Sequence, residues 1–461
     1  MQRSAITMSD RELARAIQQH ERATLPALTR LWAYYRNPAL DVPPHRAPIA
    51  SDLAQAQGLP ERLRAKFPED GGEVVIENDI AWRVHAMVDF MFGKPITIRS
   101  TARDPALRAT IDRVLARVLA KSGGVSLLQE LALLGHVYGY VDLLVNVAEA
   151  LRDEPRHARR AMTPPFRANS PGTQGTGNQG GQALLLSDEQ IERATSMMRI
   201  DVIEPRRGFA LLDPGDYRTL RAFVVRSSIL GRDGARIERM DVITGARWQK
   251  YRNGRRAGES EVWWSGGRVP IVHIQNLAQP FRYEGIGEVE PLIPLQDELN
   301  TRLSDRAHRL TMQSFRVYLA RGFDPGQTLK IAPGSVIVAD SADAKIEEFG
   351  GSTHDLGEDR HIGELREALD KASAVPPIAA GAVQAKFGNL SSGNALRIAL
   401  MGVVAKTSRK RITYGAGLAQ AAELVLSALD AAGVLPTASA DREIEIDWPE
   451  TVPGEGGERE P

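Results

Sequence analysis

Acidic side chains gather in one short stretch of the sequence, at a spacing that could support acid–base chemistry. The stretch contains Glu358, Asp359, Glu364, Glu367 and Asp370. Two positioned carboxylates can activate water for hydrolysis, one as general acid and one as general base. However, Arg360, Arg366 and Lys371 alternate with these acids, and opposite charges three or four residues apart stabilise an exposed helix face. We therefore interpret the stretch as a salt-bridged surface, with hydrolysis of nucleic acid by paired acids as the alternative.

The densest basic run could contact phosphate. It consists of Lys406, Arg409, Lys410 and Arg411 and lies in an Ala- and Leu-rich region. For these residues we favour a solvated helix face over a DNA contact. The chain has 58 basic and 58 acidic residues, so no net charge draws it to nucleic acid or to an anionic membrane. Any DNA contact must therefore be local.

Other reactive patterns are missing from the sequence. Without cysteine, the chain cannot form disulfides, Cys-ligated zinc sites, iron–sulfur clusters or a catalytic thiolate. The histidines show no H-E-x-x-H spacing, and neither a Walker phosphate loop nor a G-x-S-x-G elbow occurs. Ser391 and Ser392 precede a predicted helix, where capping explains them. We predict no catalytic residue, no metal site and no cofactor.

The length and composition predict a folded protein of two or three domains. Hydrophobic residues make up 43% of the 461 residues, which is enough for a sizeable core. The first residues lack the apolar segment of a signal peptide, and no run of 18 apolar residues occurs. We expect a soluble protein made in the cytoplasm.

The N-terminal third is predicted to be mainly helical. Ser9 and Glu12 have the spacing of a capping box, and apolar periodicity continues from there to Tyr35. The same periodicity predicts further helices, followed by one strand, over residues 78–92, 105–121, 125–138 and 140–147. Residues 152–182, rich in Pro, Gly and Ser, are predicted to form a mobile loop.

The next region has the pattern of a meander sheet. Short β-rich runs lie at residues 200–203, 209–212, 223–225, 240–243, 248–251 and 262–264. Asn253–Gly254 and Gly266–Gly267 are hairpin-type turn signals. The aromatic residues here are interpreted as cross-strand packing, with stacking on nucleic acid as the alternative: Trp248, Tyr251, Trp263 and Trp264.

A long amphipathic segment begins at Gly285 and reaches about Tyr318. Its apolar positions recur at helical spacing, at Leu292, Leu295, Leu299, Leu303 and Leu310, between charged residues. A helix of roughly 25 residues would be about 38 Å long. This length predicts a rod that spans something or packs beside copies of itself.

The segment is followed by further elements of both kinds. Short β candidates lie at residues 317–319, 329–331 and 336–338. A helix marked by Ile362, Leu365 and Leu369 is predicted to end near Ser373, before Pro376 and Pro377. A Gly-containing loop over residues 379–392 leads to a long helix over 394–432, with a kink expected at Gly415 and Gly417. A strand over residues 443–448 and a disordered tail are predicted to follow.

The order of these elements resembles the tailed-bacteriophage portal proteins, the head–tail connectors of siphophage type. The resemblance rests on GRVPIVHIQN (267–276) before LIPLQDELNTRLSD (292–305), and on VDFMFGKPITI (88–98), HVYGYVDLLVNV (136–147) and LSSGNALRIAL (390–400). No single motif is diagnostic, but their order covers most of residues 10–450.

The resemblance implies an α+β portal fold. Its parts would be a helical and β wing (1–285), a first stem helix (286–312), a small α/β clip (313–356), a second stem helix (357–376), a tunnel loop (377–393), a long wing helix (394–433), and a wing strand with a disordered tail (434–461). A C-terminal crown would be reduced or missing.

The resemblance also implies a function. Portal proteins form a ring, usually of twelve subunits, at one capsid vertex of the virion, and double-stranded DNA passes through it during packaging and ejection. Assembly would take place in the host bacterial cytoplasm. The implied partners are the terminase large subunit, the major capsid and scaffolding proteins, and a head-completion or adaptor protein. A nuclease and a head–tail adaptor ring without a packaging role remain the alternatives.

Two groups of site residues follow from this assignment. Residues expected to face the channel or DNA are Glu364, Glu367, Asp370, Lys371, Lys386 and Asn389. Residues expected to pack stem helices within and between subunits are Leu292, Leu299, Leu303 and Leu310.

Overall fold

The computed structural model describes residues 10–36, 75–153, 186–231, 234–314, 317–321, 345–349, 356–381 and 393–451. Its contacts divide the chain into two compact units. Unit 1 comprises Met1–Arg36, Ile80–Pro291 and Ser373–Pro461, and unit 2 comprises Asn37–Asp79 and Leu292–Ala372. The described part is mixed α+β, as expected. The β candidates at 329–331 and 336–338 and nearly all of the loop predicted at 152–182 lie outside the described residues.

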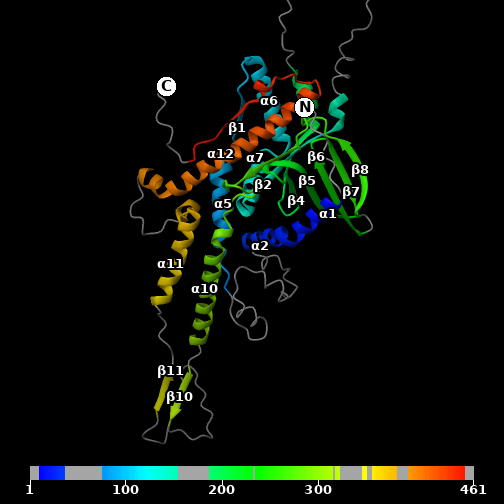
Figure 1. Ribbon diagram of the computed structural model, residues 1–461. Helices are drawn as coiled ribbons and strands as arrows, with labels where there is room; N and C mark the ends of the chain where they lie inside the picture. Colours follow the sequence, from blue (N-terminus) through cyan, green and yellow to red (C-terminus); the bar gives the residue numbers. More distant parts are fainter. Residues whose placement is uncertain are drawn as a thin grey trace, which may run out of the picture. The chain divides into compact units, whose positions relative to one another are not determined.

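The centre of unit 1 is a three-stranded antiparallel sheet. Strand β2 (Tyr140–Val147) lies between β3 (Met198–Ile203) and β9 (Ile271–Gln275). Only Asn146 of β2 is not fully buried, because helices pack against this sheet. They are α6 (Pro105–Lys121), α7 (Val125–Tyr138) and α12 (Gly393–Ala431), as Figure 1 shows. Shorter elements complete the unit: α9 (Asp188–Ser196), η3 (Glu149–Asp153), η5 (Pro377–Ala380) and η7 (Ser439–Arg442).

The end of α7 confirms the predicted helix boundary and has a second structural role. Gly139 caps the helix with a φ of 89°, a left-handed conformation that glycine adopts at little cost. A Cβ atom at Gly139 would lie 2.4 Å from the carbonyl oxygen of Gly285. Glycine is therefore required here both to end the helix and to let two backbone segments meet.

The predicted meander is a five-stranded antiparallel sheet. Its strands follow in order as β4 (Gly208–Asp213), β5 (Asp216–Leu230), β6 (Arg236–Thr244), β7 (Arg247–Arg252) and β8 (Arg255–Glu261). Asn253 and Gly254 have φ angles of 48° and 74°. Positive φ at both central residues is typical of the two-residue turn that joins hairpin strands.

Three details of this region differ from the prediction. Residues 200–203 belong to β3 of the three-stranded sheet and not to the meander. Residues 262–264 are not a strand. The last strand of the meander, β8, begins at Arg255 directly after the Asn253–Gly254 turn, and it ends at Glu261. The turn at Gly266–Gly267 leads to β9, which belongs to the other sheet, so it is not a hairpin.

The N-terminal helices pack against two parts of unit 1, the first against the meander sheet and the second against α7. They are α1 (Asp10–Gln19) and α2 (Leu25–Arg36), joined by the π-helical turn η1 (His20–Thr24). Leu13 packs on Val224 and Val242, with Tyr251 beside them. Trp248 and Trp264 are also buried, so core packing explains these aromatic residues as expected.

Helix α12 is a core helix of unit 1. It is continuous through Gly415 and Gly417, and a Cβ atom at Gly417 would lie 2.3 Å from Cγ1 of Ile274. Glycine at this position therefore allows α12 to pack closely on β9. Residues 395–431 are long and apolar enough to cross a membrane, but in the most apolar window 56% is buried inside the protein, which is typical of a core helix.

The predicted C-terminal strand is β12 (Ile444–Asp447), and its partner is β1 (Thr97–Ser100). The two strands lie far apart in the sequence. Helix α5 (Asp79–Phe92) precedes β1, and its last residue, Phe92, packs on Trp448 with ring centroids 5.4 Å apart. The C-terminal strand is thereby joined to the N-terminal part of the chain.

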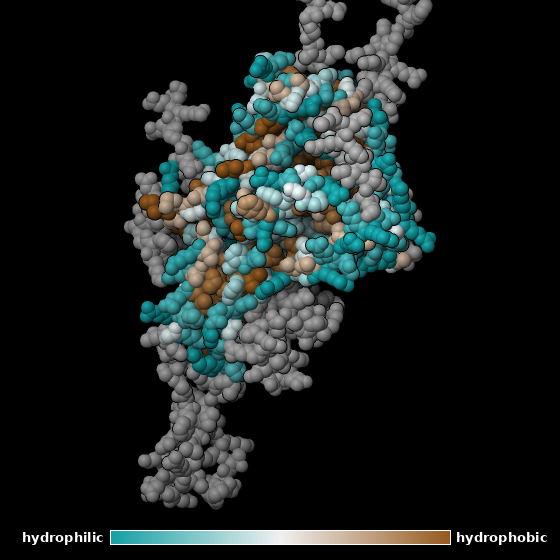
Figure 2. Space-filling view, viewed as in Figure 1, coloured by the Kyte–Doolittle hydropathy of each residue, from teal (hydrophilic) through white to brown (hydrophobic). Residues whose placement is uncertain are grey.

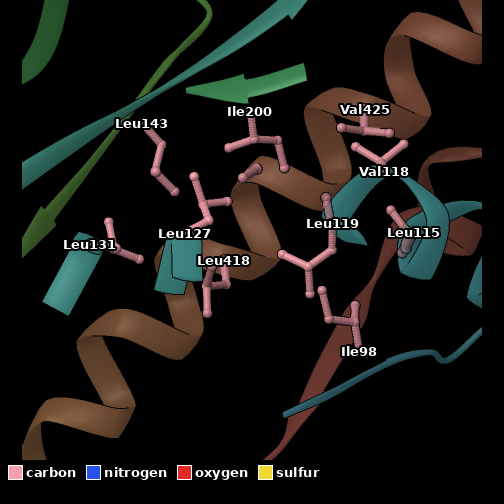
Figure 3. A pocket seen from close by; sticks show the side chains of 12 residues that line it. Ile98, Leu115, Val118, Leu119, Leu127, Leu131, Leu143, Ile200, Leu418 and Val425 are labelled. Atoms are coloured by element: carbon pink, nitrogen blue, oxygen red, sulfur yellow. The ribbon is translucent and has the colours of Figure 1, made fainter. Parts of the chain in front are cut away.

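The core of unit 1 contains a small apolar cavity of about 20 Å³. Leu119, Leu127 and Leu418 approach one another at it, as Figure 3 shows. All of its lining side chains are aliphatic, and a buried water needs polar partners. The cavity is therefore a packing defect rather than a ligand site.

Unit 2 contains two long helices and a β-ribbon. Helix α10 (Ile293–Ser314) follows the short turn η4 (Glu290–Leu292), and β10 (Val317–Arg321) pairs antiparallel with β11 (Lys345–Phe349). Helix α11 (Leu356–Ser373) ends at the predicted residue, and Ala374 has a φ of 57° before the two prolines. Helices α10 and α11 lie side by side (Figure 1).

Candidate functional site: two charged helices and a buried ion cluster

Ion pairs join the two long helices of unit 2. Arg306 lies 2.9 Å from Asp359, and Arg309 pairs with Glu358. A third contact places His361 Nε2 3.6 Å from the carboxylate of Glu298. Residue numbers rise along α10 as they fall along α11 in these pairs, so the helices are antiparallel.

Helix α11 has one apolar and one charged face. Ile362, Leu365 and Leu369 are buried, as their spacing predicts. Of the residues expected to face a channel, Glu364, Glu367 and Lys371 are exposed and Asp370 is half-buried. Glu364 also pairs with Arg360 at 3.2 Å. The structure thus brings four candidates together on α11, whereas Lys386 and Asn389 lie outside the described residues.

The leucines expected to pack the stem differ in exposure. Leu292 and Leu299 are 1% and 0% exposed within a single chain. Leu303 is half-buried, and Leu310 is 45% exposed. Leu303 and Leu310 therefore remain available for a contact with another molecule, whereas Leu292 and Leu299 already contribute to the core.

Most of the buried face of α10 is polar, which the sequence analysis missed. Gln296, Asn300 and Ser304 are 0%, 0% and 1% exposed. Their side chains accept hydrogen bonds from three backbone N–H groups of the preceding segment, at Asp79 (3.1 Å), Glu77 (3.0 Å) and Val75 (3.0 Å) respectively. Gln296 Nε2 also donates to the Glu77 carbonyl at 2.6 Å.

We call these three side chains and the backbone groups they bind the polar ladder. The ladder forms because the repeat of the helix matches the repeat of the extended segment. Four helical residues rise about 6 Å, and two extended residues span roughly 6.6 Å. Every fourth residue of α10 can therefore meet every second residue of an extended segment. The pattern Gln–x₃–Asn–x₃–Ser between leucines is the signal that could have identified it.

Unit 1 contains a buried ion cluster of Glu288, Lys406 and Lys410. Lys410 Nζ lies 2.6 Å from one oxygen of the Glu288 carboxylate, and Lys406 Nζ contacts the other oxygen. The Glu288 side chain is 4% exposed and that of Lys410 is 0% exposed. We interpreted Lys406 and Lys410 as part of a solvated face. That interpretation is wrong, because both point into the core, although Arg409 of the same run is exposed.

The electrostatics of the cluster follow from burial and pairing. Burial alone would raise the pKa of Glu288, but Lys410 and Lys406 lower it to about 2. Burial lowers the pKa of Lys410 to about 8, although Glu288 opposes the shift. Burial, followed by the charge of Lys410, lowers the pKa of the adjacent His136 to about 3. At neutral pH the cluster therefore holds an ionised Glu288 beside a neutral His136.

The ion cluster lies where the chain leaves unit 1 and where it returns. Glu288 precedes the end of the segment Ile80–Pro291, and its N–H donates to the His136 carbonyl at 2.7 Å. Lys406 Nζ donates to the carbonyl of Ser373, the first residue after the return, at 2.8 Å. Residues of the cluster thus form hydrogen bonds beside both chain crossings of unit 1.

The described residues offer no set of metal ligands. Among them, no three His, Asp or Glu side chains gather closely enough to hold an ion. The acids of α11 are spread along a helix and partly neutralised by arginine. Nothing in their arrangement favours hydrolytic chemistry.

Comparisons with known proteins point to one family. The family model described as phage portal protein, SPP1 Gp6-like, matches residues 83–456. No curated protein matches the chain. Two solved structures have low similarity: a virion of a native gene transfer agent particle and the neck of an empty particle of this kind. The first is 15% identical to this chain with a TM-score of 0.41, and the match covers 80% of this chain and 79% of that chain. The second is 14% identical with a TM-score of 0.42, and the match covers 80% of each chain.

Proposed function

The chain belongs to the SPP1 Gp6-like family of phage portal proteins, and we propose that it forms a ring around a DNA channel at one vertex of a capsid. The observation that carries the proposal is the family match over residues 83–456, a range that includes parts of both units of the chain. Twelve subunits, location in the virion and assembly in a bacterial cytoplasm belong to the same proposal.

The geometry of unit 2 supports the assignment of its parts. Helices α10 and α11 would form the stem (286–312 and 357–376), and the ribbon β10–β11 would belong to the clip (313–356). The two helices are held by ion pairs on one side, and α11 keeps an exposed charged face. Helices with one apolar and one charged face can stand side by side around an aqueous channel.

The charge distribution suits a conduit through which DNA slides. Each phosphate that a protein neutralises releases counterions, so many contacts would hold DNA in place. The chain has no net charge, and arginines of unit 2 are paired with acids. In this proposal Glu364 and Glu367 repel the phosphates, while Lys371 attracts them only locally.

The clip is the proposed docking site for the terminase large subunit and later for a head-completion or adaptor protein. The major capsid and scaffolding proteins would surround the wing, which comprises residues 1–285, the long helix at 394–433 and the strand near the C-terminus. Terminase binding separates a packaging portal from an adaptor ring without a packaging role.

Negative-stain microscopy and mass photometry of the purified chain test the proposal directly. We expect large rings with a central hole. A monomer or dimer that cleaves DNA in magnesium would instead establish the nuclease alternative and overturn the portal assignment.

Charge reversal tests which helix faces the channel. The double variant Glu364→Lys, Glu367→Lys should form rings but package or retain less DNA, because the lysines would hold phosphates. The matched control is Glu149→Lys, Glu238→Lys, which reverses two exposed acids of unit 1. Unchanged packaging and retention in the α11 variant would remove α11 from the channel wall.

A further inference from the structure

A loop closed by hydrogen bonds lies in unit 1 between β9 and η4. The Ile286 N–H donates to the Leu277 carbonyl at 3.0 Å, and Asn276 Nδ2 donates to the Ile286 carbonyl at 3.0 Å. These bonds join the two ends of residues 277–286. We call this segment the knob loop.

Side chains from the sheet hold the knob loop from within. Tyr283 donates its hydroxyl to Asp142 at 2.7 Å, and its ring stacks on His273 at 3.6 Å between centroids. His273 bonds through Nδ1 to Asp142 (2.8 Å) and through Nε2 to the Tyr283 carbonyl (2.6 Å). Gln275 Nε2 donates to the carbonyls of Arg282 and Tyr283, each at 2.9 Å. The backbone of the loop is therefore fixed on one side by a dense polar network.

The tip of the loop displays a strained aromatic residue. Phe281 has a φ of 62° and is 86% exposed. A bulky residue at positive φ is strained. An aromatic ring exposed to water also lacks the favourable free energy that its burial would give. Strain that the surrounding structure enforces is a feature of binding sites, and buried aromatic anchors dominate interfaces. This combination points to a side chain presented for insertion into a partner.

Helix α12 has a complementary surface. Ile398, Met401 and Ile412 are 72%, 66% and 72% exposed, and brown surface is visible at the N-terminal end of this helix in Figure 2. Between Met401 and Ile412 the same face carries only the small exposed residues Ala405 and Ser408. The two bulky side chains are about 16 Å apart along the axis, and the small side chains of Ala405 and Ser408 lie between them. We call these five residues the α12 notch.

Charges flank the two surfaces in a complementary way. Glu284 is exposed beside the tip of the knob loop, and Arg409 is exposed beside Ser408 in the notch. Opposite charges around an apolar contact fix its register and disfavour wrong partners. Both the knob loop and the α12 notch belong to unit 1 of one chain.

We propose that Phe281 of one subunit inserts into the α12 notch of the next copy of this chain. Two different patches make a head-to-tail contact, which repeats around a ring, whereas a single self-complementary patch would give a two-fold dimer. The inference rests on the proposed ring and identifies one of its subunit contacts.

Cross-linking of single-cysteine variants tests this contact, because the chain has no cysteine of its own. One preparation carries Phe281→Cys and a second, differently tagged one carries Met401→Cys. After mixing, assembly and oxidation, we expect a disulfide-linked dimer containing both tags and no dimer from either preparation alone. A double variant with both substitutions should give a ladder of linked subunits.

Other results would overturn the contact. Dimers from Phe281→Cys alone would indicate a two-fold contact. Linkage within one chain of the double variant, without a ladder, would mean that the knob loop covers its own notch. Rings that form without any of these cross-links would refute the contact while leaving the proposed function intact, and failure of the unmodified chain to form rings would refute the proposed function itself.

Substitutions of Phe281 separate binding from folding. Phe281→Gly removes the ring and tolerates the positive φ, so its Tm should stay equal or rise while ring yield falls at least tenfold. Phe281→Asp should lose ring assembly as well. Leu230→Asp is the matched control, because Leu230 is 79% exposed on β5 and belongs to neither the knob loop nor the α12 notch, so this variant should assemble normally. Normal ring yield from Phe281→Gly would contradict the proposal.

Discussion

The buried ion cluster of unit 1 and the charged face of α11 in unit 2 use the same kinds of side chains in opposite surroundings. In the cluster, Glu288 and Lys410 are almost wholly removed from water. On α11, the side chains of Arg360 and Glu364 are 82% and 59% exposed, although they too form an ion pair. The difference lies in the solvent, not in the residues.

Solvent determines what each pair contributes. An exposed pair gains little because water screens it. A buried pair gives no large net stabilisation either, because both ions lose their hydration, but breaking it leaves a bare charge in the core. The cluster therefore acts as a requirement for correct folding at the chain crossings, whereas charges on the face of α11 can change with little effect on folding stability.

The largest effect is expected when Glu288 is neutralised. Glu288→Gln would leave two lysines in the core without a counter-charge and should lower the free energy of unfolding by about 3–5 kcal/mol. Urea unfolding measures the change. The control is the triple variant Glu288→Met, Lys406→Met, Lys410→Met, which removes every charge and should recover most of the loss. Equal losses in both variants would show that packing, not charge, holds this region.

Acid should weaken the same region. Glu288 and His136 have lowered pKa values in the folded state. As the pH falls, the unfolded chain therefore takes up protons at these two residues before the folded chain does, and this favours unfolding. The His136 contribution is lost between about pH 6.5 and 3, and that of Glu288 between about pH 4.5 and 2. The Glu288 shift alone corresponds to about 3 kcal/mol.

Urea unfolding at a series of pH values, followed for the native chain and the triple methionine variant, measures this dependence. The native chain should lose more stability than the variant below pH 4.5. Parallel curves would show that other groups cause the acid sensitivity.

An intermediate effect is expected in the polar ladder of unit 2. Asn300→Leu would leave the Glu77 N–H without its acceptor and should cost about 1–3 kcal/mol. The neighbouring Thr301→Val is the control, because the Thr301 hydroxyl donates to the Asp297 carbonyl of its own helix. Hydrogen exchange at the Glu77 amide should accelerate in Asn300→Leu and stay slow in Thr301→Val.

The smallest effect is expected on the exposed face of α11. Arg360→Ala should change the free energy of unfolding by less than about 0.5 kcal/mol. A loss as large as that of Glu288→Gln would mean that this face is covered in the isolated chain and would remove the contrast between the two regions.

Local sequence signals predicted much of the fold correctly. The turn at Asn253–Gly254, the helix end at Gly139 and the end of α11 near Ser373 all depend on residues within one or two turns of the chain. The apolar face of α11 follows from its own spacing. The order of such elements was enough to indicate the family, although the assignment of Glu364, Glu367 and the stem leucines to a channel and its packing remains a prediction.

What the sequence determined by itself is therefore the local structure, because backbone preferences and periodicity act between near neighbours. Only the tertiary structure decided which strands pair, as β1 does with β12, and which charges are buried. Glu288 and Lys406 are separated by 118 residues, and no local pattern distinguishes a lysine that reaches a buried carboxylate from one in water. Their burial depends on how α7, α12 and the chain crossings pack, and that packing is a property of the whole unit.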